Sequence, residues 1–406
     1  MIIKVAWRNV WRNLTRSGVV MLAVSLGLWA GIFLAAFMYG ISEQRLKGVV
    51  ESQTSHIQIH HPEFLDNYDV ALLMPDGDAV VENIKRNEKV LGVSGRIVVQ
   101  GMVSSPRNSS GVMVRGVVPE DEKLVTNLAS KISGGDFFET AGRNQVVIGK
   151  KLAEDLGVKL KSKIVLTFQD SSDNIASGAF RICGIFKTNS SIFDGTTVYV
   201  RSADIASSKL LNMEGSLHEI AMVTKTEEQV DSVKSELVVA LPAKKVESWK
   251  DLIPELYYLD SIMDVYLLIF MGIILLAMAF GIINSMLMAV LERIKELGML
   301  MSVGMTKRKI FGMIVIETVF LTLVGTPLGL ALGYFSVGYF NHNGLDLSLF
   351  AAGLNNFDLD SVLYPSLDSS FYPELVVMVV ITAILSAIYP AIKALQLRPA
   401  EAIRSM

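Results

Sequence analysis

Four long apolar stretches alternate with polar segments along this chain. The stretches cover residues 17–41, 265–291, 310–340 and 375–392. Each is long enough to cross about 30 Å of hydrocarbon as a helix, which takes roughly 20 residues. Residues 42–263 alternate instead between short strands, charged helices and turns, as in an ordinary soluble domain. The pattern predicts an α-helical membrane protein with four transmembrane helices and a large α+β extracytoplasmic domain between the first and second.

Basic residues gather at one end of each apolar stretch and predict the orientation. Residues 1–16 hold four of them and no acid, the loop 292–309 ends in three, and residues 393–406 hold three more. The segment 341–374 holds no lysine or arginine but contains four aspartates. Because lysine and arginine collect on the cytoplasmic side, both termini and the loop 292–309 are expected inside, with 42–263 and 341–374 outside. The first stretch exceeds the apolar core of a signal peptide, which favours an uncleaved anchor over cleavage. Two tryptophans beside the first basic residues are typical of an amphipathic helix at the inner membrane surface.

The segment 42–263 has the pattern of two strand–helix–strand halves around an insert at about residues 123–213. The halves hold strands at 56–60, 96–104, 112–118, 218–224 and 244–249 and helices at 78–86 and 227–240, and the insert holds strands at 163–168 and 180–186. This order favours an α+β sandwich. The strand at 56–60 alternates apolar and polar residues, so we expect it to be half-buried. A polar tip at 169–179 is either a docking loop or a solvated turn.

Motifs for catalysis are absent from the sequence. There is no phosphate-binding G-x-x-x-x-G-K-[ST] loop, zinc-protease H-E-x-x-H helix or G-x-S-x-G elbow, so this chain is not expected to hydrolyse ATP or to hold a cofactor. His56, His60 and His61 have no acidic or thiol companion in sequence, which argues against a metal site. The single cysteine, Cys183, is expected to be a core residue. The acidic run 120–122 resembles a solvated surface. The sequence contains no basic patch interleaved with aromatic residues, so nothing in it indicates binding to nucleic acid.

Three features of the apolar stretches stand out. Gly325, Gly329 and Gly333 recur every four residues, which favours a smooth face for helix packing over a substrate path. Glu317 lies about two turns inside the third stretch. It faces a polar interior, or a bend brings it close to water. Asn284, near the inner end of the second stretch, either bonds across helices or sits among lipid headgroups.

The run from 284 to 304, NSMLMAVLERIKELGMLMSVG, resembles the inner loop of FtsX/MacB-like permeases, the membrane subunits of type VII ABC transporters. The opening W-R-N-V-W-R-N at 7–13, the stretch 145–166 and the ending Y-P-A at 389–391 are similar to that family as well. The resemblance implies a permease of the bacterial inner membrane that dimerises and binds a separate ABC ATPase, which holds ATP and Mg. It implies that the ATPase contacts are Glu292, Arg293, Glu296, Gly298, Leu300 and Gly304.

Within that family, the long segment 341–374 and the S-H-I-Q-I strand at 55–59 resemble lipoprotein-releasing permeases of the LolC/LolE type more than macrolide exporters. The implied partners are a second copy or a related permease, lipoprotein cargo and a periplasmic carrier. The tip at 169–179 lies where such permeases carry a hook for the carrier, but it is short and lacks proline. Two alternatives stay open: an FtsX-like mechanical transducer that controls a periplasmic hydrolase or sensor, and MacB-like efflux.

Overall fold

The computed structural model of the chain describes residues 2–138, 142–170, 172, 174–207, 210, 211, 213, 215–350 and 362–396. These residues fall into two compact units. We call Met1–Ser42, Ser261–Leu347 and Val362–Met406 the helical unit, and Glu43–Asp260 with Ser348–Ser361 the sheet unit.

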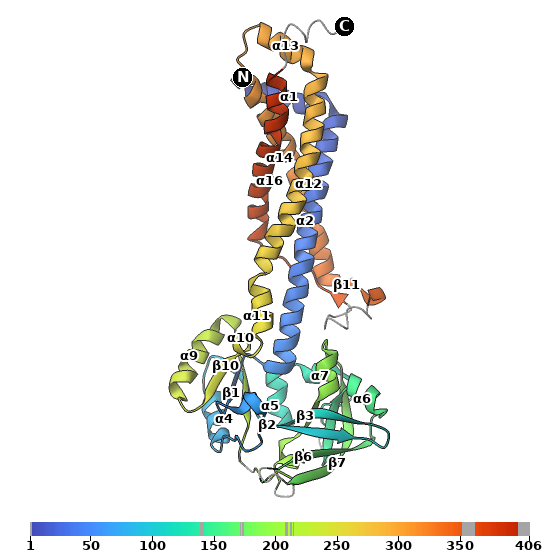
Figure 1. The fold of residues 1–406 in the computed structure, drawn as a ribbon, viewed down its shortest axis with the longest axis vertical. Helices are drawn as coiled ribbons and strands as arrows, with labels where there is room; N and C mark the ends of the chain where they lie inside the picture. The colour runs from blue at the N-terminus through green and yellow to red at the C-terminus, as the bar shows by residue number, and fades with distance from the viewer. Residues whose placement is uncertain are drawn as a thin grey trace. The chain divides into compact units, whose positions relative to one another are not determined.

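The helical unit is built around four helices that are long and apolar enough to cross a membrane (Figure 1). They are α2 (Leu14–Val49), α12 (Met263–Glu292), α14 (Lys307–Asn343) and α16 (Phe371–Leu395). The predicted fold class is therefore confirmed. All four helices extend beyond the apolar stretches seen in the sequence. In particular, α2 continues past residue 42 into the sheet unit without a break.

Shorter elements flank these four helices. α1 (Ile2–Arg12) precedes α2, α11 (Pro254–Ser261) precedes α12, and α13 (Ile294–Ser302) lies between α12 and α14. In the segment 341–374, β11 (Leu345–Asp346) pairs with β12 (Val362–Leu363), and the amide of Ser366 donates to the carbonyl of Ala36 at 3.1 Å. The middle of that segment, 351–361, and the tail beyond residue 396 lie outside the described residues.

The glycine stripe of α14 faces α2 at close range. A Cβ built on Gly329 would lie 2.8 Å from the carbonyl oxygen of Ser25 and 2.7 Å from the Cβ of Leu28. One built on Gly325 would lie 2.9 Å from the carbonyl oxygen of Met21. The hydroxyl of Ser25 also donates to the carbonyl of Gly325 at 2.8 Å. Side chains larger than hydrogen at these positions would force the two backbones apart.

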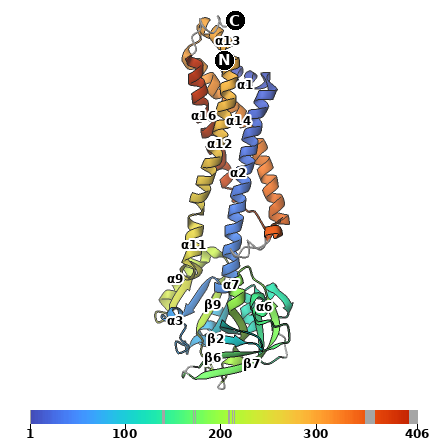
Figure 2. The same ribbon diagram turned by 45° about the vertical axis from the view of Figure 1, so that its right-hand side comes forward.

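The sheet unit contains one ten-stranded sheet, part of which closes on itself. The closed part runs through β2 (Val90–Ser104), β3 (Ser109–Val117), β8 (Thr197–Arg201), β5 (Gln145–Gly149), β7 (Ile175–Phe186) and β6 (Lys163–Gln169), which pairs back with β2. Figure 2 shows β2, β6 and β7 side by side. The open part extends from β2 through β9 (Glu219–Thr224), β1 (Ile57–His60) and β10 (Lys245–Ser248), and β4 (Ile132–Gly135) flanks β7. The expected sandwich is therefore wrong.

The ring closes because β2 is long and has a glycine where β6 approaches. A Cβ on Gly101 would lie 2.7 Å from the carbonyl oxygen of Thr167, so the missing side chain permits this pairing.

Helices cover the sheet and lie in its connections: α3 (Phe64–Asn67), α4 (Gly77–Lys85), α5 (Pro119–Val125), α6 (Lys150–Leu156), α7 (Ser191–Thr196), α8 (Ser202–Ile205), α9 (Val230–Ala240) and α10 (Trp249–Leu252). Valines and an isoleucine of α4 and α9 complete the core against the open strands.

The acidic run at 120–122 is not a solvated surface throughout. Glu122 is fully buried and accepts two hydrogen bonds from Arg96, at 3.1 and 2.8 Å, while Arg96 also donates to Glu219 at 2.6 Å. Burial alone would lower the pKa of Arg96 and raise the pKa of Glu219. The attraction between the charges outweighs burial, so the pKa of Arg96 lies above its usual value and that of Glu219 below. The sequence could not show this, because the cation comes from β2, which is separated from the acidic run by the turn to β3 and by β3 itself.

Two further expectations need correction. β1 is not half-buried, as its alternation predicts, but buried on both faces. Its polar side chains can be buried because they have partners: Gln58 donates to the carbonyl of Thr54 at 2.9 Å, and His60 lies 2.9 Å from Glu247. The polar tip is also shorter than predicted, since β6 and β7 stay paired as far as Gln169 and Ile175. β6 ends at Gln169 and β7 begins at Ile175. Cys183 is buried, as expected of a core residue.

Candidate functional site

The site lies where α12, α13 and α14 meet at one end of the helical unit. α12 ends at Glu292 because Arg293 adopts φ −102° and ψ 16°, outside the helical range. α13 follows at once and ends at Ser302. Gly304 then adopts φ +98°, a conformation that side-chain-bearing residues rarely take. A short helix is thus held between two sharp changes of backbone direction.

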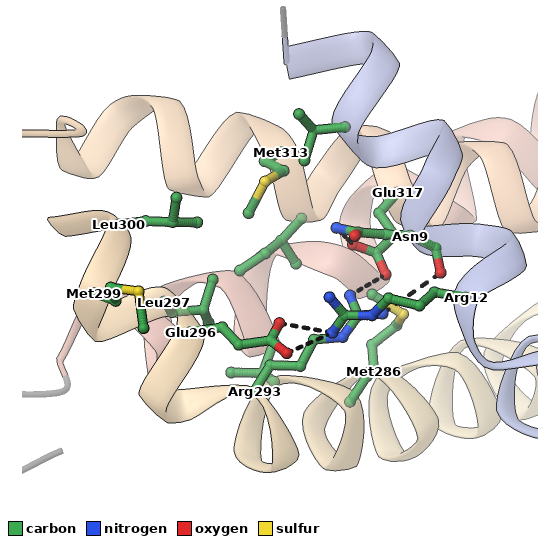
Figure 3. Close-up of a pocket in the computed structure, with 14 residues that line it drawn as sticks. Asn9, Arg12, Met286, Arg293, Glu296, Leu297, Met299, Leu300, Met313 and Glu317 are labelled. Carbon is green, nitrogen blue, oxygen red and sulfur yellow. Dashed lines mark hydrogen bonds and ion pairs between the residues drawn. The ribbon is translucent and has the colours of Figure 1, made fainter. Parts of the chain in front are cut away.

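A single carboxylate joins three segments at this point. Glu317 of α14 accepts a hydrogen bond from Arg293 at 2.9 Å and another from the amide of Asn9 in α1 at 3.2 Å (Figure 3). Arg293 also reaches the backbone carbonyl of Asn9 at 3.4 Å. The exposed fraction is 12% for the Arg293 side chain and 8% for Glu317. An ion pair so shielded from water resists screening and holds its geometry better than a surface pair.

A second ion pair lies beside the first and is open to solvent. Arg12 of α1 donates to both carboxylate oxygens of Glu296 in α13, at 2.8 and 2.6 Å. The side chains are 52% and 53% exposed, so this pair contributes less than about 1 kcal/mol. We call Asn9, Arg12, Arg293, Glu296 and Glu317 the polar cluster. Its members come from α1, from the turn before α13, from α13 itself and from α14.

A cavity of about 290 Å³ adjoins the polar cluster. Besides these five residues, its wall is mainly aliphatic and includes Met286, Met299, Leu300 and Met313. Methionine side chains adapt easily to changes in the shape of their surroundings. This wall of flexible aliphatic side chains can repack around the charged Arg293 and Glu317.

The packing of α1 keeps Asn9 in place. Ala6 and Val10 are fully buried, and Trp7 meets Phe320 of α14 edge to face with ring centroids 5.4 Å apart. These contacts lie on both sides of Asn9 along α1. Beyond the amphipathic pattern of the first helix, nothing in the sequence indicates the roles of Asn9 and Arg12.

The structure separates the residues that the sequence grouped as ATPase contacts. Arg293 turns inward to Glu317, Gly298 is buried, and Leu300 lines the cavity. The remaining three, Glu292, Glu296 and Gly304, are exposed. Asn284 lines a different cavity, of about 500 Å³, together with Asn13 and Ser285. It is therefore not brought together with Glu317.

The histidines of the sheet unit do not gather. His60 has an acidic neighbour, Glu247 of β10, which the sequence order did not reveal. Among the described residues, no group of three His, Cys, Asp or Glu side chains could hold a metal ion.

Comparison with known proteins decides the family. Residues 17–239 match the MacB-like periplasmic core domain, and residues 268–399 match the FtsX-like permease C-terminal domain. The chain is an ABC transporter permease of the FtsX/MacB/LolC type. The permease is 20% identical to a lipoprotein-releasing system transmembrane protein LolC of Neisseria meningitidis, over 94% of this chain and 92% of that protein. It is 24% identical to the LolC of Xylella fastidiosa over 82% of each, and 23% identical to the uncharacterized ABC transporter permease YknZ of Bacillus subtilis over 82% of this chain and 85% of the relative.

The matched ranges include three of the five residues of the polar cluster of the permease. Arg293, Glu296 and Glu317 lie inside the FtsX-like part. Asn9 and Arg12 precede both matched ranges. The family implies an ABC ATPase as partner, and the contacts of the N-terminal helix are a feature that the structure adds.

Proposed function

We propose that this permease couples ATP hydrolysis by a separate ATPase subunit to a conformational change of the sheet unit, and that it thereby releases lipoproteins from the bacterial inner membrane. In this proposal both termini and α13 lie in the cytoplasm, and ATP and Mg are bound by the partner and not by this chain. The observation that carries the coupling is the buried pair of Arg293 and Glu317, because it ties the turn before α13 to α14.

The geometry supports transmission of force from α13. A partner that displaces α13 would also move α12, which ends one residue before it, and α14, which Arg293 holds through Glu317. α14 in turn contacts α2 through its glycine stripe. α2 runs without interruption from the helical unit into the sheet unit. A displacement at α13 therefore has a path of contacting helices through α14 to α2, which continues beyond residue 42.

The cargo is inferred from the relatives. Two relatives with coverage above four-fifths of both chains are named as lipoprotein-releasing proteins. By analogy, this permease would pair with a second copy or a related permease and would pass its cargo to a periplasmic carrier. The exposed residues Glu292, Glu296 and Gly304 are the part of the predicted ATPase contact that lies at the surface.

The test is release of lipoprotein from proteoliposomes. The full chain would be reconstituted with the ATPase encoded beside it and with a fluorescently labelled acylated lipoprotein. We expect the lipoprotein to leave the membrane only when ATP is hydrolysed, and a hydrolysis-deficient ATPase to abolish release. Glu317→Gln should lower release per ATP hydrolysed while the two proteins still co-purify, with Arg12→Gln as the control of small effect. ATP turnover without any release would refute lipoprotein transport. If ATP turnover without release still changed the hydrogen-exchange rates of the sheet unit, the protein would be a mechanical transducer.

A further inference from the structure

Two basic residues of α1 are not used by the polar cluster. Lys4 and Arg8 lie one turn apart on this helix and are exposed. Trp7 and Trp11 flank them, with 44% and 47% of their surfaces exposed and their ring centroids 5.8 Å apart. Ile3 is also exposed, at the start of the helix. The helical repeat of 100° per residue places Ile3 and the two tryptophans together, with the two basic residues directly beside them.

This combination matches the chemistry of an anionic membrane surface. Tryptophan favours the level of the lipid headgroups, and exposed basic residues next to an apolar face are attracted to negatively charged headgroups. Within the described residues no ion pair involves Lys4 or Arg8, whereas Arg12 of the same helix is paired with Glu296. The helix also leads, after one intervening residue, into the membrane-spanning α2. That connection keeps α1 at the membrane boundary.

We propose that α1 binds anionic lipid headgroups through Lys4 and Arg8, and that this contact controls how firmly α13 is held. The proposal rests on the cytoplasmic orientation proposed above. Lys4, Arg8 and Arg12 follow one another at one-turn intervals along one stripe of α1. Lys4 and Arg8 meet the lipid, Arg12 at the end of the stripe pairs with Glu296, and Asn9 on the neighbouring face donates to Glu317. Lipid that anchors α1 therefore stabilises the polar cluster, while loss of anionic lipid loosens α1 and α13 together.

The test uses the full chain alone in nanodiscs, without ATP, ATPase or cargo, so its outcome is independent of lipoprotein release. Hydrogen exchange of α1 and α13 is compared between phosphatidylcholine and a mixture of phosphatidylcholine with phosphatidylglycerol. We expect the anionic lipid to slow exchange of α1 by on the order of tenfold, as two basic residues near a charged surface imply. Exchange of α13 should slow as well, and added salt should reduce both effects.

Three variants separate the steps. Lys4→Gln/Arg8→Gln should abolish the response of α1 and α13. Lys307→Gln/Lys309→Gln, a change of two exposed charges at the start of α14, should leave both responses intact. Asn9→Ala should keep the response of α1 but weaken that of α13.

Three outcomes would overturn the proposal. The first is equal exchange of α1 in the two lipid mixtures. The second is a response of α1 in the unaltered chain that α13 does not share. The third is loss of ATPase co-purification by Lys4→Gln/Arg8→Gln in an uncharged detergent, because these charges would then dock the ATPase and not lipid.

Discussion

Among the residues that the structure describes, each unit contains one buried arginine–carboxylate group, and the two groups differ in their surroundings. Arg96 of the sheet unit is fully enclosed and is held by Glu122 and Glu219 from two other elements. Arg293 of the helical unit has one carboxylate partner, Glu317, beside a cavity of about 290 Å³. The side chains of the first group are at most 4% exposed. The second has space and adaptable methionines around it.

This difference indicates what each unit does. A charge network enclosed on all sides fixes one arrangement of strands, since every alternative leaves a buried charge without a partner. A single ion pair next to a void can break and re-form at lower cost, which suits an element that must move. We therefore interpret the sheet unit as a rigid body and the polar cluster as the place where the permease changes shape.

The largest expected effect is at Arg96. Arg96→Met leaves Glu122 and Glu219 buried without a cation, which should cost about 3–5 kcal/mol in the stability of the sheet unit. Hydrogen exchange of β2 and β9 in the full chain measures the loss. As control, Lys89→Met breaks a pair with Glu236 whose side chains are 41% and 50% exposed, and it should cost less than about 1 kcal/mol. If Arg96→Met and Lys89→Met cost similar stability, the burial of Arg96 would not explain its effect.

The next effect is at Glu317. Glu317→Gln keeps the shape of the side chain but removes the charge that Arg293 binds, which should cost about 2 kcal/mol. Exchange of α13 amides should accelerate about thirtyfold, as this free energy implies, and exchange in the sheet unit should not change. A variant whose α13 stays protected would show that the buried pair does not hold this helix.

The glycine stripe should give a comparable or smaller effect. Gly329→Ala places a Cβ against the backbone of α2 at Ser25, and overpacking of this kind costs about 1–3 kcal/mol. Gly338→Ala is the matched control in the same helix, because a Cβ there meets nothing within 4 Å. We expect a lower thermal unfolding temperature of the full chain in detergent for the first variant only. An equal shift for both would show that the contact is not tight.

The smallest effect is expected at Arg12. Its pair with Glu296 is about half-exposed, so Arg12→Gln should change the free energy of α13 opening by less than about 1 kcal/mol. Raising the salt concentration should remove even that difference from the unaltered chain. If Arg12→Gln matched Glu317→Gln in α13 exchange, the distinction between the buried and the exposed pair would fail.

The sequence predicted the parts of this molecule that depend on local pattern. Hydropathy located the four long helices, and turn residues located most strands. The inward turn of Arg293 was not predictable, since it requires α14 to fold back beside α12. Asn9 lies 308 positions before Glu317, and nothing in a single sequence marks two such distant residues as neighbours. Glu122 appeared solvated for the same reason, because its cation belongs to a strand that is brought close only by the fold.

The long strand β2 has a mechanical consequence. Its first part pairs with β9 of the open sheet, and its last part pairs with β3 and β6 of the closed ring. Both halves of the sheet unit thus share one continuous backbone, with no hinge between them. A displacement of the open strands is therefore passed to the closed ring through the backbone of β2.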